Sequence, residues 1–219
     1  MQLQLLERGV QDIVVPDDAP AEALRRRLEI ALQRKALDRL ARKAFATDLA
    51  TGLPNHTQLL EHMTHLTALR EREPAPMAVI ALRIEGLAAV RDALGLESSN
   101  VLRRKVAVRL RASLRASDVV ASIGNDSFVV LLAWIDSPSD GERVAHKLIN
   151  ALHQPFSVAG TDLAVTAHAG LALYPEHGKT ADVLLRRSVG QAASLASMGP
   201  EGLAATIERG RTPAANDSP

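Results

Sequence analysis

The sequence predicts an α+β fold, in which a mixed central sheet is flanked by helices and preceded by an extended helix. Residues 77–84 form a continuous apolar run, interrupted only by Arg83, that suits a buried central strand. Residues 119–132 place two apolar runs on either side of a tight polar turn, which is typical of a β-hairpin. Segments of helical composition separate the expected strands, and this alternation indicates a sheet covered by helices.

The composition of the chain excludes several classes of protein. Of its 219 residues, 47% are hydrophobic and only 2% are aromatic, so the core has to be built from Ala, Leu, Val and Ile. A formal net charge of +1 gives no general attraction to nucleic acid or to a membrane surface. The absence of Cys excludes disulfides and thiolate metal sites, and no apolar run approaches the roughly 20 residues that span a bilayer. We therefore expect a cytoplasmic protein that has no membrane span and binds no nucleic acid.

Two segments precede the strands of the sheet. In residues 1–20, the apolar run Ile13-Val14-Val15 leads into a Pro-rich turn, so a short strand and a turn are expected. Residues 21–47 contain no Pro or Gly and are rich in Ala, Leu, Arg, Glu and Lys, which favours one long helix. The apolar residues of this helix form two irregular stripes, which leaves a homodimer contact and a partly buried linker helix as alternatives.

The remaining elements can be placed in order along the chain. Gly52 and Pro54 interrupt the helical pattern after residue 47. Helices are then expected at residues 57–72, 86–94, 100–116, 139–152 and 180–197, and a second strand pair at residues 156–158 and 163–173. The last residues, 206–219, are mostly small and polar and are expected to form a flexible tail.

Two motifs, in this order, resemble those of the GGDEF, or diguanylate cyclase, family. Residues 48–56 read DLATGLPNH and resemble the motif D-x-LTGLPNR with which the family's domain opens. The hairpin turn, Gly124-Asn125-Asp126-Ser127-Phe128, stands where the family has its signature GGDEF. An ordered series of motifs is more specific than one short pattern, and the resemblance implies a nucleotide-cyclase palm-like fold over residues 48–205.

The segments before this domain carry a second resemblance. The sequence GVQDIVV within residues 1–20 and the helix at 21–47 are similar to the closing strand and last helix of a response-regulator receiver domain. The half of a receiver that accepts phosphate is absent. The resemblance therefore implies a receiver remnant followed by a signalling helix, and no phosphorelay is inferred from this remnant.

The resemblance also implies that the family's metal site is altered. The family joins two GTP molecules with the help of a divalent metal, which neutralises phosphate charge. Its metal ligands are an Asp on the first core strand and the third residue of the signature. Asp126 matches the third residue, but Arg83 occupies the strand position, and we expect Arg83 to pair with Asp126 instead of tolerating Mg²⁺ beside it. Glu85 lies two residues further along the same strand face and leaves a residual metal site open as an alternative.

Further positions that the family uses for chemistry are changed as well. Asn125 replaces the second signature Gly, and Ser127 replaces an acidic residue. Of the pair that reads guanine in the family, only Asp92 remains, and two phosphate-binding positions correspond to Ala196 and Pro200. Because metal, base and phosphate contacts are lost together, the resemblance implies a degenerate domain without cyclase activity. No cofactor is expected, apart from Mg²⁺ if a residual activity exists.

One ligand motif of the family is retained. Arg115-Ala116-Ser117-Asp118 matches the inhibitory RxxD motif, which in the family binds the product, cyclic di-GMP, and Lys147 aligns with a second basic residue of that site. An Arg fork can hold phosphate or a guanine edge, and an Asp can accept hydrogen bonds from guanine. An ordinary solvated pair, largely exposed at a helix end, is the alternative for so short a motif.

These observations lead to one hypothesis and two alternatives. The first is an inactive GGDEF-like domain that acts as a cyclic di-GMP receptor or regulates a protein partner in that pathway. The second is a protein-interaction scaffold that has lost nucleotide binding, and the third is a residual cyclase that uses Asp126 and Glu85. We interpret the basic residues of the helix at 100–116 as a solvated face, because no aromatic residues lie between them; they are Arg103, Arg104, Lys105, Arg109 and Arg111.

Overall fold

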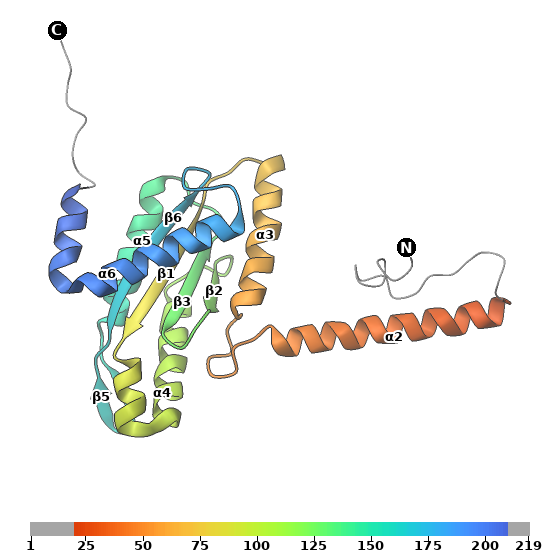
Figure 1. The fold of residues 1–219 in the computed structure, drawn as a ribbon, viewed down its shortest axis with the longest axis horizontal. Helices are drawn as coiled ribbons and strands as arrows, with labels where there is room; N and C mark the ends of the chain where they lie inside the picture. Colours follow the sequence, from red (N-terminus) through yellow and green to blue (C-terminus); the bar gives the residue numbers. More distant parts are fainter. Residues whose placement is uncertain (1–19, 210–219) are drawn as a thin grey trace, which may run out of the picture. The chain divides into compact units, whose positions relative to one another are not determined.

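The computed structural model describes residues 20–209 and, within them, the side chains of residues 20–37 and 46–197 (Figure 1). The chain divides into two compact units, residues 1–47 and residues 48–219. The strand expected before Pro20 and residues 210–219 of the expected tail lie outside the described residues.

The first unit contains the expected long helix, α2 (Ala21–Phe45). Arg25 and Glu29, four residues apart on this helix, form an ion pair of 3.3 Å. Leu28, Leu32 and Leu37 are 59%, 59% and 65% exposed. Within the described part of the chain, no helix is both long and apolar enough to cross a membrane.

The second unit is built around a four-stranded sheet in the order β2-β3-β1-β6 (Figure 1). Its strands are β1 (Met77–Glu85), β2 (Val119–Ser122), β3 (Ser127–Leu132) and β6 (Thr166–Tyr174). The α+β fold is confirmed, but all neighbouring strands are antiparallel, whereas the sequence predicted a mixed sheet. The reason is that β3 lies between β1 and β2, so these two strands, which run in the same direction, are not hydrogen-bonded neighbours.

The second strand pair also differs from the predicted one. β4 (Phe156–Val158) pairs with β5 (Thr161–Leu163) in a separate two-stranded sheet. The sequence predicted a single strand over residues 163–173, because apolar residues continue through the break at 164–165 that separates β5 from β6. The turn at Ala159 and Gly160 has two positive φ angles, 49° and 78°, which match the twist of a tight hairpin.

Helices cover the two faces of the sheet; they are α3 (His56–Arg72), α4 (Leu87–Ala112), α5 (Pro138–Leu152) and α6 (Ala181–Arg209). α4 joins the two helices expected at 86–94 and 100–116 and bends at Gly95, whose φ of 82° and ψ of 170° are not helical. It ends at Ala112, before the predicted residue 116, because the chain turns there into residues 113–118. α6 continues to Arg209, through the first residues of the expected tail.

Side-chain caps explain where two of these helices begin. Asn55 Oδ1 accepts a hydrogen bond of 3.1 Å from the Gln58 N–H at the start of α3. At the start of α5, Ser137 and Asp140 form a capping box, and the Asp140 carboxylate accepts from the Ser137 N–H at 2.9 Å. Both helices begin one residue before the predicted start.

The sheet is buried on both faces, which explains the apolar run that predicted β1. Ile80 and Leu82 belong to a core shared with α4 and α5. Val79 and Ala81 belong to a second core, shared with α3 and with α6, which crosses the sheet in Figure 1. A strand with helices on both faces has no polar side, so its sequence reads as a continuous apolar run.

The packing of α6 on β6 leaves no room for a side chain at Gly170. A Cβ at this position would lie 2.0 Å from the Ser188 carbonyl oxygen and 2.6 Å from the Ala192 nitrogen. Both atoms belong to the backbone of α6, so the helix has to move to admit a methyl group. We expect Gly170→Ala to lower the free energy of unfolding by about 2–3 kcal/mol, measured by urea unfolding.

Gly190→Ala is the matched control. Gly190 lies in α6, and an added Cβ would meet nothing within 4 Å. Helix propensity predicts a gain of roughly 0.5–1 kcal/mol there. Equal stability of the two variants would contradict the close approach of α6 to β6.

Candidate functional site

The signature turn lies between β2 and β3 and is attached to the end of β1. Residues 124–126 form the turn, and β3 begins at Ser127. The Ile84 N–H donates to the Asp126 carbonyl oxygen at 2.8 Å, and Arg83 pairs in register with Ser127. The structure therefore confirms the predicted hairpin and places its turn beside Arg83.

The turn does not need the conformational freedom of glycine. Neither Gly124 nor Asn125 has a positive φ angle, and a Cβ on Gly124 would meet its nearest neighbour at 3.7 Å, an ordinary contact. Asn125 is exposed, so its side chain adds bulk to the surface of the turn without backbone strain. Phe128 is fully buried in the core and anchors the start of β3.

Arg83 and Asp126 form the ion pair that the sequence predicts. Arg83 Nη2 lies 3.1 Å from Asp126 Oδ2, and the two side chains are 45% and 35% exposed. The other carboxylate oxygen, Asp126 Oδ1, accepts a hydrogen bond of 2.8 Å from Ser127 Oγ. Both oxygens of Asp126 are thus engaged by protein donors, and a positive charge stands where a metal ligand is expected.

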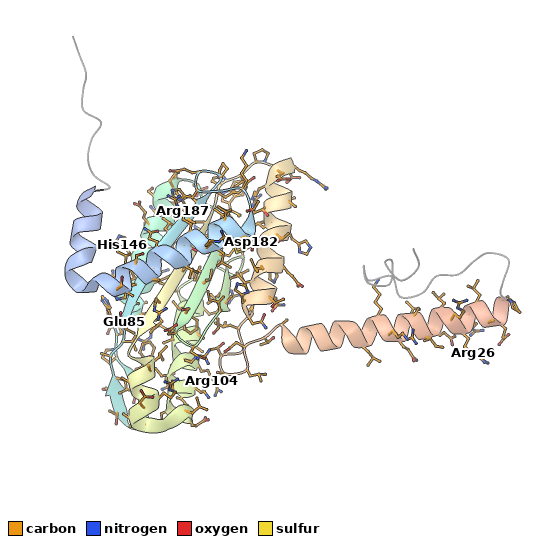
Figure 2. The ribbon with its side chains drawn as sticks, in the orientation of Figure 1. Arg26, Glu85, Arg104, His146, Asp182 and Arg187 are labelled. Atoms are coloured by element: carbon orange, nitrogen blue, oxygen red, sulfur yellow. The ribbon has the colours of Figure 1, made fainter. Side chains whose placement is uncertain are left out.

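Glu85, the alternative metal ligand that the sequence suggested, lies beside a histidine. It lies at the end of β1 (Figure 2), and its Oε1 is 3.4 Å from Nε2 of His168, which is buried on β6. Across the residues that the structure describes, no group of three or more His, Cys, Asp or Glu side chains could hold a metal ion.

The space beside Arg83 is small. A hollow of about 20 Å³ lies between β1, the signature turn and α6. Ligand pockets usually measure about 300–1,000 Å³. The α6 residues that line this hollow are apolar and offer no group that would hold a phosphate; they are Val189, Ala192 and Ala193.

The remaining positions of the altered nucleotide site lie on α4 and α6. Asp92, the residual base-reading position, has a 70% exposed side chain on α4 and pairs with Arg91 at 3.2 Å. Ala196 is half-buried on α6, and the side chain of Pro200 lies outside those described. Neither the Asp92 side chain nor Ala196 lines the hollow beside Arg83.

The retained RxxD motif forms a compact turn directly after α4. Asp118 is 6% exposed, and its Oδ2 accepts a hydrogen bond of 2.9 Å from the Arg115 N–H. Lys147, on α5, donates from Nζ to the Ser113 carbonyl oxygen at 2.7 Å. The Arg115 side chain is exposed. The structure therefore brings Arg115, Asp118 and Lys147 together at one turn.

The expectation of a largely exposed pair at this motif is wrong for Asp118. Its carboxylate binds the backbone of the motif because the N–H of Arg115, just beyond the end of α4, needs an acceptor. The Asp118 N–H in turn donates to the Arg115 carbonyl oxygen at 3.2 Å. Asp118 is thus a structural residue of the turn, whatever ligand the turn binds.

Comparison with known proteins decides the family. A family model described as "Diguanylate cyclase, GGDEF domain" matches residues 45–194. The chain belongs to the GGDEF family. The match confirms the predicted family, a domain type of cyclic di-GMP signalling. Solved structures of GGDEF domains confirm the palm-like fold.

Similar proteins are found in several bacteria. The chain is 33% identical over 138 residues to the bifunctional diguanylate cyclase/cyclic di-GMP phosphodiesterase MucR of Pseudomonas aeruginosa, a match that covers 63% of this chain and 20% of MucR. The GGDEF domain of TpbB from P. aeruginosa superposes with a TM-score of 0.62 at 30% identity, covering 65% of this chain and 83% of that one. A sensory box/GGDEF family protein from Caulobacter crescentus superposes with a TM-score of 0.66 at 27% identity, covering 70% and 99%. The chain spans about a fifth of the length of MucR.

The basic residues of α4 in this GGDEF domain form the predicted solvated face only in part. Arg104, Lys105 and Arg111 are exposed, whereas Arg109 is half-buried and Arg103 is buried. Arg104 Nε donates to the Ala50 carbonyl oxygen at 3.1 Å, and Lys105 Nζ donates to the Ser157 carbonyl oxygen. The Arg109 guanidinium lies 3.5 Å from the centroid of the Phe156 ring and donates to the carbonyl oxygens of Ala151 in the last turn of α5 and of Gln154 and Pro155 in the loop that follows. These side chains donate to backbone carbonyl oxygens of neighbouring segments, and helix composition alone does not reveal such contacts.

Arg103 departs furthest from the prediction, since it is buried. Its Nη2 lies 3.1 Å from Asp48 Oδ2, from Ser122 Oγ and from the Gly124 carbonyl oxygen. Asp48 opens the GGDEF domain, and Gly124 begins the signature. The first residue of one motif and the first residue of the other are therefore joined through one guanidinium. No motif in the sequence distinguishes Arg103 from the other basic residues of α4.

Opposing influences act on the pKa of Asp48. Burial of the carboxyl is the largest and raises its pKa. Hydrogen bonds from Thr51 and the charge of Arg103 act in the opposite direction and together prevail, so the pKa lies below its usual value of 3.8. Thr51 donates to Asp48 Oδ1 from Oγ1 at 2.6 Å and from its N–H at 2.9 Å.

The lowered pKa of Asp48 predicts a pH dependence of stability. The ionised carboxylate stabilises the fold above the unfolded-state pKa near 3.8, and this stabilisation is lost as pH falls through the folded-state pKa. We expect Asp48→Asn to be less stable than the unmodified chain at about pH 7 and the difference to shrink below about pH 4. Urea unfolding across this pH range measures the difference, with Asp92→Asn as a control at an exposed carboxylate. A difference that stays constant with pH would mean that the charge of Asp48 is unimportant.

Proposed function

We propose that this GGDEF domain is a cyclic di-GMP receptor that synthesises no cyclic di-GMP itself. The observation that carries the proposal is the Arg83–Asp126 ion pair of 3.1 Å, which puts a cation and a neutralised carboxylate at the expected metal site. The RxxD turn, by contrast, is fully formed and presents an exposed Arg115.

The absence of cyclase activity follows from the charge at the altered site. Phosphoryl transfer depends on divalent metal to neutralise phosphate oxygens and to position the attacking group. The Arg83 guanidinium repels a divalent cation and already occupies Asp126 Oδ2, while Ser127 occupies Oδ1. Arg83 is itself a cation, but its guanidinium does not replace a divalent metal, which would neutralise the phosphate oxygens and position the attacking group.

Receptor function rests on the donors that surround the RxxD turn. Arg115 offers a planar fork to a phosphate or to a guanine edge. Lys147 holds the Ser113 carbonyl at 2.7 Å, which puts a second positive charge two residues before Arg115. Cyclic di-GMP carries two phosphates and two guanines, so a compact turn with two cations suits it, and the buried Asp118 carboxylate holds this turn in place.

A receptor also needs a surface through which it acts. We assign this role to α2, whose Leu28, Leu32 and Leu37 are all more than half exposed. Exposed leucines repeated along one helix favour contact with another protein. The proposed contact is with a protein partner of the cyclic di-GMP pathway or with a second copy of the chain as a homodimer.

The proposal predicts that the purified chain forms no cyclic di-GMP from GTP with Mg²⁺ or Mn²⁺. Arg83→Asp alone is expected to remain inactive, because Ala192, Ala193 and Ala196 of α6 supply no phosphate contacts. Chromatography of the nucleotide products measures the outcome. Product formation by the unmodified chain would support the residual cyclase instead.

The proposal also predicts binding of cyclic di-GMP in the micromolar range. Arg115→Ala removes a charge-assisted hydrogen bond worth roughly 1.5–3 kcal/mol, so the affinity measured by calorimetry is expected to fall about tenfold or more. Lys147→Ala is expected to weaken binding less. Arg115 is exposed, so Arg115→Ala is expected to leave the melting temperature nearly unchanged.

Asp118→Ala requires a separate measurement of stability. Because Asp118 is buried and holds the Arg115 N–H, this variant is expected to lower the melting temperature as well as the affinity. Arg115→Ala is therefore the variant that tests binding alone. If the unmodified chain binds cyclic di-GMP and Arg115→Ala binds equally well, the motif is not the site; if the unmodified chain does not bind, the scaffold function is the better account.

A further inference from the structure

Arg111 is a third cation at the RxxD turn, and no motif of the sequence marks it. It lies in the last turn of α4 and is exposed. Its guanidinium Nη1 donates to the carbonyl oxygen of Asp118, the last residue of the motif. We propose that Arg111 is a positioning residue, which fixes the RxxD turn in the conformation that binds cyclic di-GMP; this inference rests on the receptor function proposed above.

Charged side chains hold the turn at both of its ends. Lys147 donates to the Ser113 carbonyl oxygen at the point where α4 ends, and Arg111 donates to the Asp118 carbonyl oxygen where β2 is about to begin. Between these two points, the Asp118 carboxylate accepts from the Arg115 N–H at 2.9 Å. Hydrogen bonds with one charged partner are about twice as strong as neutral ones, so the two cations clamp the turn effectively.

This clamp has a direct consequence for Arg115. The Arg111 contact holds the backbone of Asp118, and the Asp118 carboxylate holds the backbone of Arg115. Arg111 therefore acts on Arg115 through Asp118, without a contact of its own with Arg115. A turn that is already ordered pays less conformational entropy when the ligand arrives, and its affinity is correspondingly higher.

Arg104 provides a matched control for Arg111. Both arginines lie on α4, both are exposed, and each donates to a backbone carbonyl oxygen, which for Arg104 is that of Ala50 at 3.1 Å. Arg104, labelled in Figure 2, makes this contact at the loop that opens the domain and not at the RxxD turn. Substitution of either arginine by Ala removes the same charge from the same helix.

The experiment compares Arg111→Ala, Arg111→Lys and Arg104→Ala in the full chain. Calorimetry with cyclic di-GMP gives the affinities, and amide hydrogen exchange without ligand gives the protection of the Arg115 N–H. We expect Arg111→Ala to lower the affinity about three- to tenfold and to speed exchange at Arg115. Arg111→Lys, which keeps a donor and a charge, is expected to recover part of both losses, and Arg104→Ala to change neither.

Each other outcome overturns the inference in a recognisable way. Unchanged affinity in Arg111→Ala would show that the clamp is unnecessary. Lower affinity with unchanged exchange at Arg115 would show that Arg111 contacts the ligand directly, and an equal loss in Arg104→Ala would show an effect of overall charge. Absence of binding by the unmodified chain would instead overturn the receptor function itself, together with this inference.

Discussion

The buried guanidinium of Arg103 is the interaction on which both candidate sites depend. The side chain is 7% exposed, and its Nη2 lies 3.1 Å from each of three oxygens, in the loop that opens the domain, at the end of β2 and in the signature turn. Removing one partner from a buried ion pair typically costs about 3–5 kcal/mol, because the remaining charge is left without compensation. The same helix, α4, leads directly into the RxxD turn. Arg103 therefore connects the loop, the hairpin and α4, and the RxxD turn follows at the end of the same helix.

The signature turn is held through its backbone, so its position does not depend on which side chains it carries. The Gly124 carbonyl is held by Arg103, and the Asp126 carbonyl is held by the Ile84 N–H at 2.8 Å. The β-ladder then sets Arg83 opposite Ser127, so Arg83 and Asp126 meet as a consequence of the sheet. The ion pair is more than one-third exposed on both sides, so it contributes at most about 1 kcal/mol to stability. The main effect of the ion pair is on metal binding, because it engages the Asp126 carboxylate that would otherwise be available to a metal ion.

Local patterns in the sequence predicted the helices and strands. The features that were missed depend on contacts between segments that are far apart in the sequence. The apolar run at 77–84 and the hairpin at 119–132 are confirmed because strand burial and turn polarity are local properties. The antiparallel arrangement was missed because it depends on the insertion of β3 between β1 and β2. The burial of Arg103 was missed because its partners lie in segments far from α4 in the sequence. The Arg83–Asp126 pair was predicted correctly only because the family resemblance supplied the long-range contact.

The RxxD motif illustrates why a retained motif and a retained function are different things. Asp118 is buried and accepts a hydrogen bond from the Arg115 N–H, so this Asp contributes to stability whether or not the turn binds a ligand. The same holds for Arg111 and Lys147, whose hydrogen bonds to the carbonyls of Asp118 and Ser113 hold the turn. Arg115 is different, because its side chain is exposed and the turn uses only its backbone. Within this motif, the guanidinium of Arg115 is therefore the group that indicates ligand binding. Its removal is expected to lower the affinity for a ligand without lowering the stability of the fold.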